Sequence, residues 1–128
     1  LNYLNLKPMK NNATNNRIKQ MIFSSVYPLY LAKVEKKGRT KEELDLVISW
    51  LTGYNLREIE KHIQDCSSFE IFFAAAKLNS NAKLITGTIC GYRIEEIEDD
   101  LTKKVRWLDK LVDELAKGKK MEKILRVA

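Results

Sequence analysis

Residues 41–52 carry apolar side chains at steps of three and four, which is the spacing of one face of an α-helix. The positions on this face are Leu44, Val47, Ile48 and Leu51. Thr40 and Glu43 match a capping box, in which the hydroxyl accepts from a backbone amide while the carboxylate reaches back. Gly53 then supplies a stop signal. We therefore predict a helix over residues 41–52 that buries this face in the core.

Comparable signals mark further helices along the chain. The predicted segments are residues 26–37, 56–65, 69–78, 101–117 and 121–128. Serines at residues 24–25 precede the first segment, where Pro28 is tolerable only in the first turn. Ser67 with Glu70 forms a second capping-box pattern, ahead of a Phe-rich helix. Residues 82–90 fit either a helix or a strand, because threonine and glycine interrupt them.

One ten-residue phrase occurs twice. LTGYNLREIE begins at Leu51, and ICGYRIEEIE begins at Ile89. Glycine adopts a left-handed backbone at little cost, so Gly53 and Gly91 are expected to end one helix just before the next begins. This interpretation predicts two similar Gly-Tyr helix-turn-helix corners, produced by duplication of a helical hairpin. Chance similarity of a short stretch is the alternative.

The predicted elements define an all-α protein. At 128 residues the chain suits one domain, and we expect a single-domain orthogonal bundle of about five to seven helices over residues 17–128. Residues 1–16 are interpreted as a leader that is disordered or vector-derived, with Met9 as a candidate native start. The sequence contains no apolar run of transmembrane length and no secretory pattern, which predicts a cytoplasmic location and no membrane partner.

The net charge of +6 is distributed unevenly. Basic residues concentrate in residues 1–40 and 115–128, whereas the middle of the chain is neutral or acidic. Basic surfaces attract polyanions, although a run of charge is more often a solvated face. The candidate nucleic-acid contacts are Lys33, Lys36, Lys37, Arg39, Arg57 and Lys61.

Two DNA-binding motifs compete for the repeated phrase. The residues of both copies are compatible with a DNA-binding helix-turn-helix, but the sequence pattern of that motif is degenerate. A helix-hairpin-helix would need a second glycine where Asn55 and Arg93 stand. Residues 93–100 hold one cation against five carboxylates, which repels phosphate, and the first copy is nearly neutral. Nucleic-acid binding is therefore the alternative function, and a non-catalytic interaction or binding protein is the leading hypothesis.

The sequence contains no motif that names a reaction. Cys66 and Cys90 are interpreted as reduced thiols, and Cys90 is expected to be buried. With these two cysteines and a single histidine, His62, the sequence matches no known spacing of zinc ligands. His62 lies four residues after Glu58, which predicts an ion pair on a helix surface. The acidic residues 95–100 favour a helix N-terminus paired with lysines over a metal site. We assign no catalytic residue, cofactor or metal ligand, and the sequence leans away from an enzyme.

Tyr27 and Tyr30 are the candidate partner surface. They could belong to an exposed aromatic patch that binds a protein, or they could be tyrosines at the edge of the core beside a serine cap. Trp50 and Trp107 are interpreted as core anchors. The sequence leaves the partner and the oligomeric state open.

The order of several segments resembles a known family. These segments are FSSVYPLYLAKVEKKGRTKEELDLVISWLTGY, FEIFFAAAKLN, ITGTICGYRIEEIED and LDKLVDELAKGKKMEKILR, and together they span about residues 17–126. They are similar to an uncharacterised family of small bacterial proteins, the domain of unknown function numbered 2200. At Asp100 the chain departs from the proline that the family would have after Asp99. The resemblance implies a small, mainly helical bacterial protein of the cytoplasm, and it supplies no catalytic residues.

Overall fold

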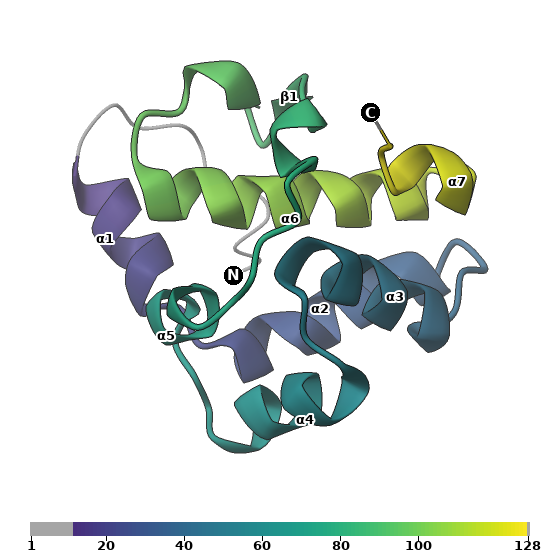
Figure 1. Cartoon of the computed structure of the whole chain (residues 1–128), viewed down its shortest axis with the longest axis horizontal. Helices are drawn as coiled ribbons and strands as arrows, with labels where there is room; N and C mark the ends of the chain where they lie inside the picture. Colours follow the sequence, from purple (N-terminus) through teal and green to yellow (C-terminus); the bar gives the residue numbers. More distant parts are fainter. Residues whose placement is uncertain (1–11, 128) are drawn as a thin grey trace.

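A computed structural model describes residues 12–127 as an all-α bundle that carries one small β-hairpin (Figure 1). The α-helices in this range are α1 (Asn12–Gln20), α2 (Phe23–Glu35), α3 (Lys41–Thr52), α4 (Leu56–Gln64), α5 (Phe69–Ala74), α6 (Asp100–Ala116) and α7 (Met121–Ile124). The hairpin strands are β1 (Thr88–Ile89) and β2 (Tyr92–Arg93), and the short 3₁₀ helices are η2 (Ala82–Leu84) and η3 (Ile94–Glu96).

The expected leader falls mostly outside the described residues. Residues 1–11, including the candidate start Met9, are not part of the description. Residues 12–16 were assigned to the leader on composition, but they form the first turns of α1. Thr14 is buried and Asn15 accepts a hydrogen bond from the hydroxyl of Thr102 in α6. Packing against α6 therefore makes this polar stretch helical.

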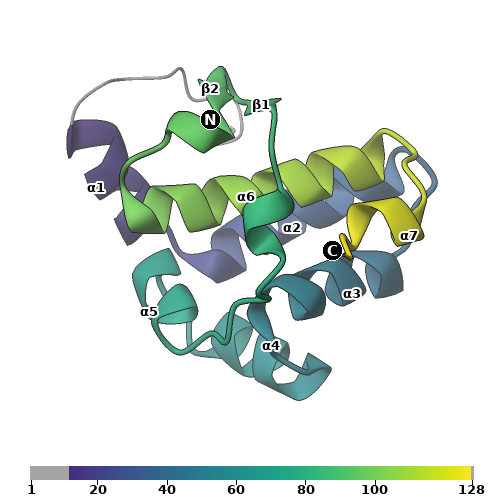
Figure 2. The same cartoon turned by 45° about the horizontal axis from the view of Figure 1, so that its top comes forward.

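Helix α6 is the centre of the bundle. It contacts α1, α2, α3, α5, α7, β1 and η3, and Figure 2 shows α2 lying behind it. Its fully buried apolar residues are Val105, Leu108, Leu111, Val112 and Leu115. Asp99 caps the first turn by accepting from the amide of Thr102. The predicted helix over residues 101–117 is confirmed to within one residue at each end, and it gives all its neighbours a common core.

Helix α3 agrees with its prediction at both ends. Thr40 and Glu43 form the full capping box, in which each side chain bonds the other residue's backbone amide. Gly53 ends the helix with φ of 76° and donates to the carbonyl of Ser49. The four predicted core positions, Leu44, Val47, Ile48 and Leu51, are all fully buried. Local sequence signals are sufficient to specify this helix.

The start of α2 differs from the prediction. The helix begins at Phe23 with Ile22 as its N-cap, so the serines at residues 24–25 lie inside the first turn. Pro28 lies beyond the first turn and removes one helical hydrogen bond. Phe23 determines the earlier start, because its ring is fully buried and stacks on Phe72 with 4.1 Å between centroids. Tertiary packing therefore outweighs the cap signal of the serines.

The N-cap of α5 lies one residue later than predicted. Ser68 is the cap, and its hydroxyl accepts from the amide of Ile71. Ser67 is instead buried, with its Oγ 2.8 Å from Nδ1 of His62. The helix ends at Ala74 and is shorter than predicted. The buried aromatic residues of α5 are Phe69, Phe72 and Phe73, as expected.

The first copy of the repeated phrase connects α3 to α4. The connection is Gly53–Asn55, and Tyr54 folds back over it, buried, with its hydroxyl donating to the carbonyl of Phe72. Ile59 of α4 is buried, whereas Leu56 is 58% exposed. Leu56 is the first helical residue, where α4 has not yet reached the core.

The second copy forms a β-hairpin, and the predicted second helix-turn-helix corner is wrong. The strands pair antiparallel within Thr88–Arg93. The turn residues Cys90 and Gly91 have φ of 53° and 82°, and two successive left-handed residues are typical of a type I′ hairpin turn. Gly91 is left-handed, as predicted, but in a different structure. The two copies of the phrase therefore adopt different structures, and the predicted duplicated pair of helical corners is not present.

Candidate functional site

The hydroxyl groups of Tyr27 and Tyr30 point into the molecule. Tyr27 is 6% exposed and Tyr30 is fully buried. The first donates to Oδ1 of Asp45 at 2.5 Å, and the second donates to Oδ1 of Asp109 at 2.6 Å. A buried tyrosine hydroxyl requires a hydrogen-bond partner, which here is a carboxylate on a facing helix. Placing these tyrosines on a partner surface is therefore wrong, and they belong to the edge of the core.

Asp45 sits at a charged junction between α2 and α3. Nζ of Lys41 donates to its Oδ2 at 2.7 Å and lies 5.7 Å from the ring centroid of Tyr27. Burial, together with the Asp45 carboxylate, raises the pKa of Tyr27 to about 12. The hydrogen bond to Asp45 also raises the pKa of Lys41. A general acid or base works best with a pKa near the operating pH, so this arrangement favours a structural role.

A second buried network surrounds Arg106 of α6. Nη1 of Arg106 donates to Oδ2 of Asp109 at 2.9 Å, and both side chains are fully buried. The ring of Tyr92 packs on the guanidinium group, with its centroid 4.9 Å from Cζ of Arg106. With Tyr30, this ion pair connects α2, α6 and β2. Such a pair fixes the position of the hairpin on the bundle.

Neither Cys66 nor Cys90 forms a disulfide within residues 12–127. Cys90 is half-buried in the hairpin turn, where sequence analysis expected full burial, and burial raises the pKa of its thiol. A raised pKa disfavours the reactive thiolate. Cys66 is exposed. Neither residue lies in a setting that activates a nucleophile.

His62 is packed among aromatic rings. Its ring centroid lies 4.8 Å from that of Tyr54 and 5.2 Å from that of Phe72. Burial lowers the pKa of His62. The predicted ion pair with Glu58 does not form, because Glu58 completes a capping box with Asn55 instead. His62 therefore belongs to the packing of α4 against α5.

The acidic residues before α6 have local partners. Oε1 of Glu95 accepts from the backbone amide of Gly87 at 2.7 Å. Asp100 pairs with Lys104 at 2.8 Å, which is the helix N-terminal role expected from the sequence. Across residues 12–127, no group of three or more His, Cys, Asp or Glu side chains is arranged to hold a metal ion.

Two loops that are remote in sequence lie side by side at one end of the bundle. Residues 36–40 follow α2, and residues 117–120 follow α6. Arg39 joins them, because its Nη1 donates to the carbonyls of Leu115 at 3.3 Å and Lys119 at 2.9 Å. Together the loops hold six basic residues and no acidic one. We call these residues the basic end: Lys36, Lys37, Arg39, Lys117, Lys119 and Lys120.

The charges of the basic end fall into two groups. Arg39, Lys117 and Lys119 form ion pairs with carboxylates. Lys36, Lys37 and Lys120 are exposed, and no ion pair within the described residues engages them. These three side chains are the free cations of this surface.

The other predicted nucleic-acid contacts have different settings. Lys33 is half-buried and pairs with Asp113 at 3.2 Å. Arg57 and Lys61 are exposed on α4, at the opposite side of the bundle from α7 (Figure 1). Lys61 pairs with Asp65 at 3.2 Å. The structure therefore separates the candidate contacts into two surfaces, one at the basic end and one on α4.

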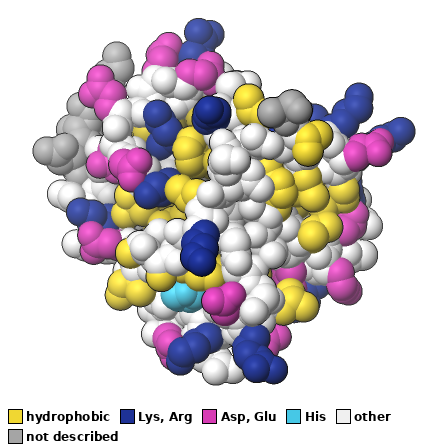
Figure 3. All heavy atoms as spheres, in the orientation of Figure 1, with side chains coloured by type: hydrophobic (Ala, Val, Ile, Leu, Met, Phe, Trp, Pro, Cys, Tyr) yellow, Lys and Arg dark blue, Asp and Glu magenta, His cyan; other side chains and the backbone are white. Residues whose placement is uncertain are grey.

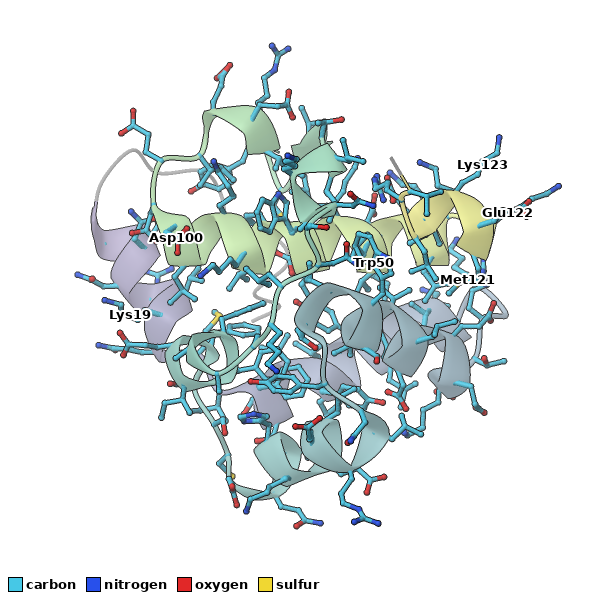
Figure 4. The ribbon with its side chains drawn as sticks, in the orientation of Figure 1. Lys19, Trp50, Asp100, Met121, Glu122 and Lys123 are labelled. Carbon is cyan, nitrogen blue, oxygen red and sulfur yellow. The ribbon has the colours of Figure 1, made fainter. Side chains whose placement is uncertain are left out.

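An apolar surface adjoins the basic end. Leu46 is 49% exposed, and Trp50 lies one turn further along the same face of α3, half-buried against the core. Helix α7 lies beside α3 in both ribbon views, and Figure 4 shows Met121 between these two helices. Figure 3 shows hydrophobic side chains gathered over this region. We call Leu46, Trp50 and Met121 the apolar strip.

Sequence analysis missed the apolar strip, because Trp50 was interpreted only as a core anchor. The spacing of Leu46 and Trp50 in the sequence did indicate a second apolar face on this helix. Leu46 and Trp50 are four residues apart and lie off the face formed by the four buried positions of α3. Met121 could be added only from the structure.

Helix α7 is held in place by the segment that follows it. Arg126 donates from Nη1 and Nη2 to the two carboxylate oxygens of Glu114 at 2.8 Å and 2.7 Å. Burial raises the pKa of Glu114, but hydrogen bonds from Arg126 and Lys119 outweigh it and leave the pKa below its usual value. Ile124 is fully buried. These contacts hold α7 and the segment after it against α6.

The fold and its surfaces define a small helical protein in which polar networks stabilise the core and an exposed basic end adjoins an apolar strip. The chain belongs to the DUF2200 family, described as an uncharacterized protein conserved in bacteria, which matches residues 17–126.

The crystal structure of uncharacterized protein SP1917 is similar to this chain. The two share 42% sequence identity with a TM-score of 0.81, over 86% of this chain and 91% of that one. No functionally curated protein matches the chain. Within residues 12–127, none of the helices is at once long enough and apolar enough to cross a bilayer.

Proposed function

We propose that the protein is a non-catalytic binding protein that recognises an anionic partner through the basic end. The observation that carries the proposal is the pair of hydrogen bonds from Arg39, which hold two cation-rich loops against each other. Lys36, Lys37 and Lys120 are then exposed on the two joined loops. Clustered solvated cations attract polyanions and release counterions on binding.

The cations at the basic end also have a local structural role. The loops follow the C-termini of α2 and α6, where positive charge offsets the helix dipole. This effect is confined to the last turn of a helix, and it does not require three further lysines without carboxylate partners. Binding of an anionic partner therefore accounts for the lysines that compensation of the helix dipoles does not explain.

Helix α4 is a weaker candidate surface for an anion. Its cations Arg57 and Lys61 are matched by Glu58 and Glu60 on the same helix. Nucleic-acid binding through the α3–α4 corner is therefore less well supported than binding through the basic end. The two surfaces can be tested separately, because each carries at least two exposed cations that can be reversed.

The test compares two double variants with the unmodified protein. Binding to labelled DNA, RNA and poly-glutamate is measured by fluorescence anisotropy as salt rises from about 50 to 200 mM. We expect salt-sensitive binding to at least one of these polyanions, weakened about tenfold or more by K36E/K37E. The matched control R57E/K61E should bind as the unmodified protein does. Absence of binding at low salt, or equal loss in both variants, would refute the proposal.

A further inference from the structure

We infer that the anionic partner is a protein segment, namely an acidic amphipathic helix that lays its apolar side on the apolar strip and its carboxylates on the basic end. This inference rests on the proposed function, because it uses the same cations. It adds the chemical class of the partner and a second surface that the partner must contact.

The apolar strip supplies the side chains that such a helix would bury. Leu46 is half exposed and Trp50 is partly exposed, one turn apart on α3. Tryptophan contributes strongly when it is desolvated near the centre of a protein interface. An amphipathic helix offers apolar side chains at steps of three and four, which match a row one turn apart.

The strip and the basic end adjoin each other at two points along the chain. Met121 directly follows Lys120, and α3 begins directly after the loop that contains Lys36 and Lys37. A partner helix that covers the strip therefore reaches these lysines with residues one or two turns away. Charge complementarity places acidic residues at that end of the partner.

The surface is formed before any partner arrives. The capping box of Thr40 fixes the start of α3, and the bidentate contact between Arg126 and Glu114 fixes the segment after α7. Arg39 holds the two loops of the basic end together. A rigid surface lowers the conformational cost of binding, which favours docking of a preformed complementary face.

The acidic residues beside the strip argue against an anionic membrane or a nucleic acid as the partner. Glu42 and Glu122 are exposed next to the apolar strip, and Figure 4 shows Glu122 pointing outward. A bilayer or a phosphate backbone would bring uniform negative charge against both carboxylates. A peptide helix can place polar or basic residues opposite them and still present carboxylates to the basic end.

The experiment uses two labelled peptides of about 15 residues, or roughly four helical turns. One has leucines along one face and glutamates on the other, and the second has the same composition in scrambled order. Anisotropy titrations with the full chain should give at least about tenfold tighter binding of the amphipathic peptide. L46E should reduce this preference to about threefold or less, whereas the control L56E, an equally exposed leucine on α4, should retain it.

The outcomes separate the inference from the proposed function. Equal binding of both peptides, or a preference that survives L46E, overturns the inference and leaves the basic end as a general anion site. Tighter binding of DNA, RNA or anionic lipid vesicles than of the amphipathic peptide also overturns it. If no polyanion binds at all, both proposals fail. Circular dichroism of each variant confirms that the fold is intact, and W50Q provides a second substitution in the strip if L46E unfolds.

Discussion

Replacing Gly53 with alanine should destabilise the protein far more than the same replacement at Gly38. Both glycines are left-handed, with φ of 76° and 81°. A Cβ at Gly53 would lie 2.9 Å from the carbonyl oxygen of Lys77, whereas a Cβ at Gly38 would meet nothing within 4 Å. The two positions therefore share the backbone strain and differ only in the space available.

The size of this extra destabilisation follows from the part of the chain that must shift to admit the new Cβ. A left-handed alanine costs about 1–2 kcal/mol at either position. At Gly53 the chain at Lys77 must also shift, although its amide donates to the carbonyl of Thr52 at 2.8 Å. Overpacking costs about 1–3 kcal/mol and a strained hydrogen bond about 0.5–1.5 kcal/mol. G53A should therefore lower the free energy of unfolding by roughly 1.5–4.5 kcal/mol more than G38A does.

Equilibrium unfolding in urea measures this difference directly. Both variants change glycine to alanine, so the effect of the substitution on the unfolded chain largely cancels between them. The dependence of the free energy on urea concentration should be the same for both variants. Equal destabilisation of G53A and G38A would show that contact between the α3 terminus and the chain at Lys77 contributes nothing, and it would refute the reasoning.

Three further predictions concern buried polar groups. Y27F should lower the free energy of unfolding by about 1–3 kcal/mol in urea titrations, because it leaves the buried carboxylate of Asp45 without one hydrogen-bond donor. The pKa of Glu114 is lower in the folded protein than its ordinary value of 4.5, so its stabilisation is complete above pH 4.5 and disappears as pH falls through the folded pKa. E114Q should therefore flatten the decline in thermal midpoint below pH 4.5, and it should also lose the contact with Arg126. The pKa of His62 is likewise lower than its ordinary 6.5, so stability falls as pH drops below 6.5, and H62Q should remove that part of the pH dependence in the same thermal scans.

The fold could be predicted from the sequence where the signals for a helix lie close together in the chain. The cap, the apolar face and the glycine stop of α3 lie within fourteen residues, Thr40–Gly53, and all three are confirmed. The prediction for the second copy of the phrase was wrong, because the conformation of that copy depends on the residues that precede it. Thr86 and Thr88 disfavour a helix, and the chain reaches Gly91 in an extended conformation that turns back on itself. The two copies also differ at one position within the phrase, because Asn55 caps α4 with its side chain, whereas Arg93 at the matching position makes no such cap.

The candidate site was predictable only in part. The sequence indicated that basic residues gather near both ends of the chain, but not that Arg39 binds the carbonyl of Lys119 across 80 positions. For the same reason, the sequence could not decide whether Tyr27 and Tyr30 lie on an exposed patch or at the edge of the core. Their partners Asp45 and Asp109 lie on other helices, 18 and 79 positions away. Pairings of this kind are tertiary, and no pattern within one helix reveals them.

The central position of α6 has a consequence for synthesis on the ribosome. The helices that pack on it from the N-terminal side, α1, α2, α3 and α5, are all translated before it. Until residue 116 has emerged, the sides of these helices that pack on α6 in the native bundle remain uncovered. We expect this intermediate to bind holdase chaperones, and the native bundle to close in one late step once the last turn of α6 is released.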